Sequence, residues 1–223
     1  MNVPFAPLLG DTLCRNEQGL VQRMLLRFVL NLGVPHYSDI EGFLSPLEAA
    51  MLYSFASRLS RDGLIVEIGS WKGRSTYCLA RGLRSGRIVA IDPFDASGDA
   101  DSVATYGNNS GRLPLRCQFA KNMYRSGVLH KIELKHGCSN MFVGTVSDID
   151  FLFIDGDHSI DGAKFDYMNY ACHLEFGGYL AFHDYYASRK ELGPTWVVDN
   201  MVARSGQYRF VGLFDSLWIG QRI

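Results

Sequence analysis

Four short, mostly apolar runs of residues restrict the folds open to this chain more than any other feature. They lie at residues 64–69, 87–92, 150–155 and 178–183, and each ends in glycine, aspartate or histidine. Runs that are apolar at nearly every position suit strands covered on both faces, because a strand with one face in water alternates apolar and polar residues. Helix-compatible stretches follow the first and third runs, at 75–83 and 160–174. This alternation predicts a doubly wound, Rossmann-like α/β domain with a mostly parallel central sheet.

The first 60 residues have a helical pattern instead. Apolar side chains recur at three-to-four spacing from Met24 to Leu32, and a second helix is expected to begin at Pro46. Ser45 can cap that helix, and Glu48 stands three residues after the cap, as a capping box requires. We interpret residues 1–60 as an N-terminal helical extension of the same domain and residues 61–223 as its α/β part.

The charge balance argues against nucleic acid and anionic membrane surfaces as partners. Twenty-two Lys and Arg residues face 23 Asp and Glu residues, for a formal net charge of −1, so no basic excess is present to neutralise phosphates. The early sequence has no secretory pattern, and Arg23 and Arg27 interrupt its most apolar stretch. Five cysteines without a C-x-x-C pair suit reduced, buried thiols. We expect a cytoplasmic protein whose apolar helical N-terminus fits a homo-oligomer interface as well as a cap on the domain.

The first motif with chemical content is Glu67-Ile68-Gly69-Ser70-Trp71-Lys72-Gly73, in which a strand ends and a helix follows. Glycines allow a tight turn and a close approach to a ligand, and the helix amino terminus offers unpaired N–H groups. A dinucleotide-binding turn would need glycine where Trp71 stands, and the spacing does not match a P-loop. Asp92 closes the next strand, where an acid is expected to accept hydrogen bonds from ribose hydroxyls. The motif predicts a nucleoside ligand with no phosphate on the turn.

The stretch VEIGSWKGRST, followed by AIDPF, resembles the cofactor half of the class I S-adenosylmethionine-dependent methyltransferases. The resemblance runs from about residue 42 to residue 186, and is closest to the small metal-dependent O-methyltransferases and the macrocin O-methyltransferase and cephalosporin hydroxylase-like group. It implies S-adenosyl-L-methionine as cofactor. The residues that it assigns to the cofactor are Glu67, Gly69, Trp71, Gly73 and Ser75 around the methionine part, Asp92 at the ribose, and Ser139 and Asn140 at the adenine.

A second set of polar residues follows the later strands. Asp155 ends one run, and His183-Asp184 ends another. The carboxyl ends of parallel strands meet at one edge of a sheet, and carboxylate oxygens suit Mg²⁺. By the resemblance, Asp155, His183 and Asp184 hold a divalent metal, Mg²⁺ or Mn²⁺. An imidazole at position 183 moves the metal preference toward Mn²⁺, Fe²⁺ or Zn²⁺, and a structural hydrogen bond of His183 is the alternative.

His158 stands three residues after Asp155, where the enzymes that this chain resembles carry a Lys or His general base. Methyl transfer to an alcohol requires removal of the hydroxyl proton, and imidazole suits that step. An isolated histidine is otherwise usually structural.

These observations predict a metal-assisted O-methyltransferase that acts on a hydroxyl of a small molecule. Two alternatives stay open: a non-heme iron hydroxylase-like enzyme on the same fold, and a non-catalytic nucleoside-binding module. The polar, glycine-rich stretch 95–116 fits either a lid over the site or a loop without function.

Overall fold

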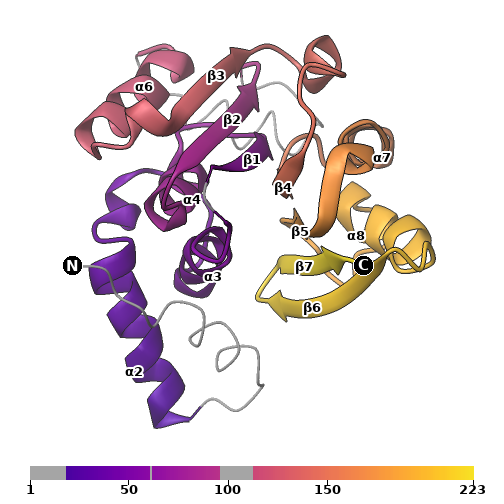
Figure 1. Ribbon diagram of the computed structural model, residues 1–223, viewed down its shortest axis with the longest axis horizontal. Coiled ribbons are helices and arrows are strands. Elements are labelled where there is room, and N and C mark those ends of the chain that lie inside the picture. The colour runs from indigo at the N-terminus through magenta and orange to yellow at the C-terminus, as the bar shows by residue number, and fades with distance from the viewer. Residues whose placement is uncertain (1–18, 61, 96–112) are drawn as a thin grey trace.

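A computed structural model of the chain describes residues 19–60, 62–95 and 113–223. Its described residues form a seven-stranded sheet in the order β3-β2-β1-β4-β5-β7-β6 (Figure 1). The strands are β1 (Gly63–Ile68), β2 (Gly86–Asp92), β3 (Ile132–His136), β4 (Ile149–Ile154), β5 (Leu174–Phe182), β6 (Tyr208–Phe214) and β7 (Leu217–Arg222). β1 to β5 pair in parallel, whereas β7 is antiparallel to β5 and β6. The predicted α/β class and mostly parallel sheet are confirmed.

Helices cover both faces of the sheet, which explains the uninterrupted apolar runs. The α-helices are α2 (Leu20–Phe28), α3 (Pro46–Ala56), α4 (Arg74–Gly82), α6 (Leu115–Arg125), α7 (Ile160–Tyr170) and α8 (Gly193–Val197). Successive strand residues point to opposite faces. In β4, Phe151 and Phe153 enter the core that contains α3, α4 and α6, whereas Leu152 enters the core that contains α7 and α8. The central strands β1 and β4 therefore have no solvent-facing side to carry polar residues.

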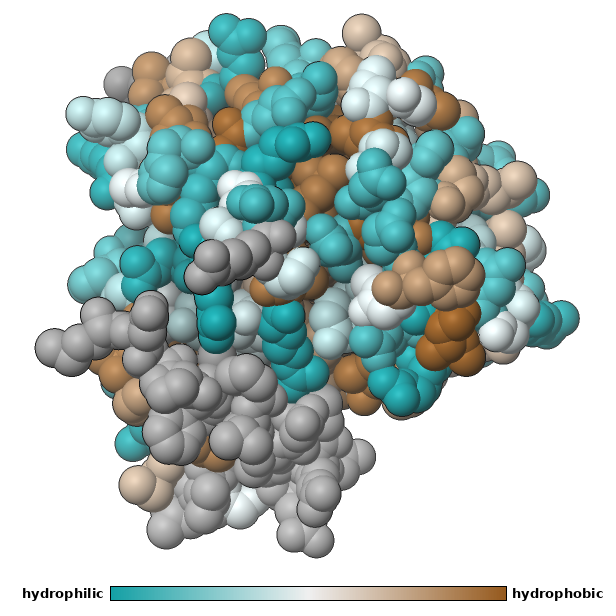
Figure 2. All heavy atoms as spheres, viewed as in Figure 1, coloured by the Kyte–Doolittle hydropathy of each residue, from teal (hydrophilic) through white to brown (hydrophobic). Residues whose placement is uncertain are grey.

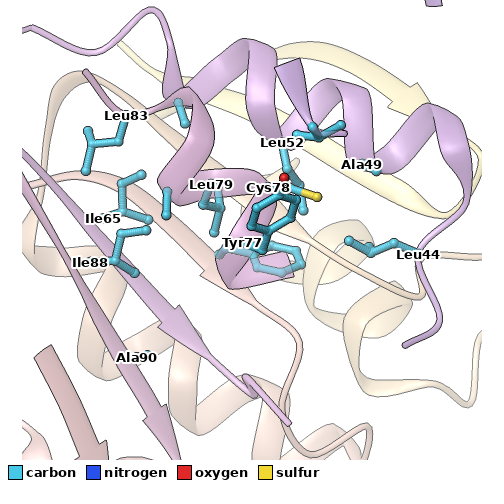
Figure 3. Packing of buried hydrophobic residues seen from close by; sticks show 14 of the residues in the cluster. Leu44, Ala49, Leu52, Ile65, Tyr77, Cys78, Leu79, Leu83, Ile88 and Ala90 are labelled. Carbon is cyan, nitrogen blue, oxygen red and sulfur yellow. The ribbon is translucent and has the colours of Figure 1, made fainter. Parts of the chain in front are cut away.

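The N-terminal helix α3 belongs to the core of the sheet. Its expected capping box is present: Ser45 Oγ accepts from the Glu48 backbone N–H at 3.2 Å, and Glu48 Oε2 accepts from the Ser45 N–H at 2.8 Å. Figure 3 shows Leu52 of α3 beside α4 and the strands, in the cluster that also contains Ile65 of β1. This packing fixes the start of α3 near the carboxyl edge of the sheet.

The surface of the described residues is mixed in character. On the face in Figure 2, hydrophilic residues are interspersed with hydrophobic ones. Among the described helices, none has the length and apolar character that crossing a bilayer requires. Of the cysteines described, Cys78 is buried, whereas Cys117, Cys138 and Cys172 are exposed thiols, so the expectation of buried thiols is wrong for these three.

Several elements differ from the sequence-based expectation. The edge strand β3 and the antiparallel pair β6 and β7 were not predicted. β3 lies at one edge of the sheet and carries Glu133 and Lys135, so it lacks the continuous apolar run of the buried strands. Helix α6 begins at Leu115, within the stretch 95–116, and residues 96–112 of that stretch lie outside the described part of the chain.

Candidate functional site

A cavity of about 1100 Å³ opens at the carboxyl ends of β1, β2, β4 and β5. Open α/β sheets bind their ligands at this edge. Ten of the residues that the sequence singled out line the cavity: Gly69, Trp71, Ser75, Asp92, Ser139, Asn140, Asp155, His158, His183 and Asp184. Residues far apart in the chain thus meet in one cavity.

The turn after β1 passes between the ends of β2 and β4. Gly69 has φ +88°, and a Cβ atom at this position would lie 1.9 Å from the backbone oxygen of Asp155. Its N–H donates to the Ile91 oxygen at 2.9 Å. Trp71 has φ +43° and stacks on Phe43 with ring centroids 5.2 Å apart. Only glycine fits at position 69, because an L side chain meets both an unfavourable φ and a backbone atom.

Glu67 and Gly73 lie behind this turn and do not line the cavity, unlike the expectation that they lie beside the methionine part of the cofactor. Glu67 is fully buried, and its Oε2 accepts from Ser70 Oγ at 3.0 Å and Thr76 Oγ1 at 2.5 Å. Burial raises the pKa of Glu67 to about 7, although these hydrogen bonds act to lower it. Gly73 begins α4 with φ +90° and packs closely on Phe119. Both residues therefore support the conformation of the turn from the interior of the protein.

Asp92 fastens the same turn to the end of β2. Its Oδ2 accepts from the backbone N–H groups of Ser70 and Trp71 at 2.8 and 2.7 Å, and its Oδ1 accepts from Phe94 at 2.6 Å. Burial raises the pKa of Asp92, and the three N–H groups oppose that shift. A carboxylate has about four acceptor positions, so Asp92 keeps acceptor capacity for a ligand while it holds the turn.

The loop after β3 is held by helix α7. Ser139 Oγ donates to Asp166 Oδ1 at 2.5 Å, and Tyr170 Oη donates to the Ser139 carbonyl oxygen at 2.6 Å. Asp166 is 3% exposed and lines the cavity. Burial raises its pKa to about 7, with a contribution from the charge of Asp157. The sequence analysis missed Asp166, although its helical spacing from the buried residues Ala163 and Tyr170 places it on the packed face of α7.

Three potential metal ligands lie together on the cavity wall. Asp155, His158 and Asp184 each offer a ligand atom, and these atoms lie within 4.8 Å of one another. His158 Nε2 is 3.3 Å from Asp184 Oδ2 and 3.8 Å from Asp155 Oδ1. Asp184 has φ +56°, an uncommon conformation that tends to occur at functional positions. Two carboxylates suit Mg²⁺ or Mn²⁺, and the imidazole moves the preference toward Mn²⁺, Fe²⁺ or Zn²⁺.

His183 occupies a different position from the one expected of a metal ligand. It is 4% exposed, with Nδ1 3.1 Å from Asp155 Oδ1 and Nε2 3.4 Å from Glu48 Oε2. Burial lowers its pKa, but the surrounding carboxylates Asp155, Asp184 and Glu48 raise it well above its usual range. Both imidazole nitrogens thus face carboxylate oxygens. The group of three potential ligand atoms contains one from His158 and none from His183.

Glu48 is the second site residue that the sequence analysis did not assign to the site. Its Oε1 accepts from the backbone N–H and the hydroxyl of Ser216, at 2.9 and 2.7 Å. Burial raises its pKa, but hydrogen bonds and the charge of His183 lower it to about 2. Glu48 and Ser216 both line the cavity. The sequence showed Glu48 only as the third residue of a helix cap, because nothing local reveals a partner on the distant turn after β6.

Comparisons with known proteins agree with this geometry. Residues 66–185 match the model of a family described as methyltransferase domain. An uncharacterized protein, R132, from Acanthamoeba polyphaga mimivirus is 26% identical over 166 residues, which cover 71% of this chain and 69% of that protein.

Solved structures share the fold. A methyltransferase from Geobacter sulfurreducens is 18% identical with a TM-score of 0.59, and the match covers 93% of this chain and 90% of that one. An O-methyltransferase from Bacillus cereus in complex with SAH is 15% identical with a TM-score of 0.61, over 90% and 97% of the two chains. The O-methyltransferase TomG from Streptomyces achromogenes in complex with SAM is 16% identical with a TM-score of 0.58, over 96% and 94%.

The matched segment begins within β1 and ends just after Asp184, so it contains the turn, the strand ends and the acids of the cavity. It covers more than half of the chain and lies within the stretch 42–186 that carries the resemblance, with which it shares only the C-terminal limit. The chain belongs to the family described as methyltransferase domain.

Proposed function

We propose that this methyltransferase transfers the methyl group of S-adenosylmethionine to a hydroxyl of a small molecule, with the assistance of Mg²⁺ or Mn²⁺. The observation that carries the proposal is the position of Asp155, His158 and Asp184, which open onto the same cavity as Gly69, Asp92 and Ser139. Solved proteins of the same fold with SAH or SAM bound, both O-methyltransferases, support the choice of cofactor.

The cofactor-binding part of the proposal uses the loops after β1, β2 and β3. The turn at Gly69 allows a ligand to approach the backbone, and Trp71 and Ser75 line the cavity beside it. Asp92 accepts hydrogen bonds from the ribose, and Ser139 with Asn140 lies at the adenine. The adenine, the ribose and the methionine part are assigned to the loops after β3, β2 and β1. These loops lie side by side, because the three strands are neighbours in the sheet.

The chemical part of the proposal uses the acids after β4 and β5. Asp155 and Asp184 hold the divalent cation, which when bound lowers the pKa of the acceptor hydroxyl and stabilises the negative charge that develops on its oxygen. His158 Nε2, 3.3 Å from Asp184, removes the hydroxyl proton. His183 holds Asp155 through a hydrogen bond to its Oδ1, so it would orient this carboxylate toward a bound cation.

Two binding measurements test the proposal. Calorimetry with S-adenosylhomocysteine is expected to show saturable binding, and titration with Mn²⁺ followed by electron paramagnetic resonance is expected to show one site. Asp155→Asn and Asp184→Asn are expected to weaken Mn²⁺ binding by about tenfold or more, with S-adenosylhomocysteine binding retained. Glu175→Gln, an exposed carboxylate away from the cavity, is the matched control.

The same measurements can refute the proposal. Absence of S-adenosylhomocysteine binding contradicts the cofactor role, and unchanged Mn²⁺ binding in both aspartate variants contradicts the metal site. Stoichiometric iron after anaerobic purification, without turnover of S-adenosylmethionine, would favour the hydroxylase-like alternative. Methyl transfer itself is tested with radiolabelled S-adenosylmethionine against a panel of catechols, sugars and aliphatic alcohols.

A further inference from the structure

The carboxylate of Asp166 is buried beside the loop that the proposed function places at the adenine. We propose that Asp166 selects the 6-amino group of the cofactor: Oδ1 holds Ser139, and Oδ2 accepts an N–H from that amino group. The inference rests on the proposed function only in that it takes S-adenosylmethionine as the cofactor.

The geometry leaves one oxygen of Asp166 for a ligand. Oδ1 accepts from Ser139 Oγ at 2.5 Å. Oδ2 lies 3.3 Å from the point where a Cβ atom on Gly156 would stand, and Gly156 lines the cavity. Within residues 19–60, 62–95 and 113–223, the only hydrogen bond to this carboxylate is the one from Ser139. Oδ2 is not fully enclosed by protein atoms; it opens on the cavity that Asp166 lines, where a ligand that brings an N–H can pair with it.

The arrangement of the strands places the base of a nucleoside here. Asp92 at the end of β2 pairs with His136 at the end of β3, and the loop with Ser139 follows directly. A ribose held by Asp92 therefore points its base toward this loop and toward α7, which holds the loop through Asp166 and Tyr170.

Adenine offers the donor that Asp166 lacks. Its 6-amino group is a hydrogen-bond donor, whereas its ring nitrogens are acceptors. A 6-oxo base presents an acceptor oxygen at the same position, which a carboxylate repels. Burial raises the pKa of Asp166 to about 7, and a donated N–H offsets this cost to the ionised carboxylate. Gly156 keeps the approach open, because a side chain there would contact Oδ2.

The test compares two ligands by calorimetry: S-adenosylhomocysteine and its 6-oxo analogue, S-inosylhomocysteine. The wild-type protein is expected to prefer the adenosyl ligand by about tenfold or more, because an unpaired buried acceptor rejects the analogue that lacks the donor. In Asp166→Asn the preference is expected to fall by about tenfold, since an amide N–H₂ can donate to the 6-oxo oxygen. Asp161→Asn makes the same charge change at an exposed position of α7 and is expected to keep the wild-type preference.

The ratio of the two affinities separates recognition from a merely structural role. Equal weakening of both ligands in Asp166→Asn, with an unchanged ratio, would overturn the proposal, as would equal binding of both ligands by the wild-type protein. If Asp166→Asn does not fold by circular dichroism, Asp166→Ser replaces it: this variant removes the acceptor carboxylate and is expected to lose most of the preference, so an unchanged preference counts against the proposal. Failure of the wild-type protein to bind S-adenosylhomocysteine would instead contradict the cofactor assignment.

Discussion

The imidazole of His183 lies between two carboxylates, with its Nε2 3.4 Å from Oε2 of Glu48 on helix α3. On its other side, Nδ1 is 3.1 Å from Oδ1 of Asp155, which follows β4. Both His183 and Glu48 are almost fully buried. Buried N–H groups need such acceptors, because a buried donor without a partner is costly.

Glu48→Ala is therefore expected to destabilise the protein by about 2 to 4 kcal/mol, because it removes a helix cap and the acceptor of the buried Ser216 donors and of His183 Nε2. Asp155 and Asp184 remain beside the imidazole. Glu48→Gln retains the capping geometry and is expected to cost less than Glu48→Ala. Urea unfolding measures both, with the exposed Glu175→Ala as the control, expected within about 0.5 kcal/mol of wild type. A Glu48→Ala protein as stable as this control would show that the His183 contact contributes nothing.

His158→Ala is expected to lower kcat by about a hundredfold to ten-thousandfold, the usual contribution of a general base. The affinity for S-adenosylhomocysteine is expected to stay within about twofold, because the loops at Asp92 and Ser139 are untouched. The kcat is measured with the methyl acceptor that the panel of catechols, sugars and aliphatic alcohols identifies. A loss of Mn²⁺ affinity equal to that of Asp155→Asn would instead make His158 a metal ligand.

Gly69→Ala is expected to destabilise the protein by more than about 3 kcal/mol and to abolish cofactor binding, because the added methyl group meets the Asp155 backbone at 1.9 Å. Gly177→Ala is the matched control. It has a similar φ of +82° with nothing within 4 Å of the added atom, so it is expected to cost only about 1 to 2 kcal/mol. Chemical unfolding of the two variants separates backbone strain from steric overlap, and equal costs would contradict the close approach of the turn to β4.

The raised pKa of Glu67 predicts that the free energy of unfolding declines as the pH rises. Its folded pKa of about 7 lies above the ordinary value of 4.5, so the folded state binds the proton more tightly. Its contribution is complete below pH 4.5 and is lost as the pH rises through about 7. The loss reaches on the order of 3 kcal/mol.

Glu67→Gln is expected to flatten this decline between about pH 5 and about pH 9, measured by urea unfolding at constant ionic strength. The pKa of Asp166 is raised to about 7 as well, so its share of the decline is expected to remain in this variant. An unchanged slope in Glu67→Gln would show that the buried Glu67 carboxyl does not titrate in this range.

The buried strands and the helix start at Pro46 could be predicted because their signals are local. A strand covered on both faces is a short apolar run, and a capping box lies within four residues. The same reasoning located Asp155, His158 and Asp184, since they directly follow strands. It left open whether His183 is a metal ligand or a structural residue. Its imidazole faces Glu48 and Asp155, and the direction of a side chain after a strand depends on which distant residues pack against it.

Glu48 and Asp166 were missed for a related reason. Both lie on helices whose periodicity indicates a packed face, but periodicity does not show whether a buried acid contacts a cavity or only a structural partner. The antiparallel strand β6 was missed because it lies at the sheet edge and exposes Arg209, Phe210 and Leu213 without a regular alternation. β7 was missed because only its first four residues form a buried run, which is shorter than the runs of the central parallel strands.

The hydrogen bonds from Ser216 to Glu48 join residues that are 168 positions apart in the chain. Contacts of such separation form slowly, since the loop they close must be ordered first. During synthesis, Glu48 emerges early and stays without its partner until the turn between β6 and β7 has been made. The hydrogen bonds from Ser216 to the carboxylate that contacts His183 are therefore expected to form among the last events of folding, after the parallel strands have assembled.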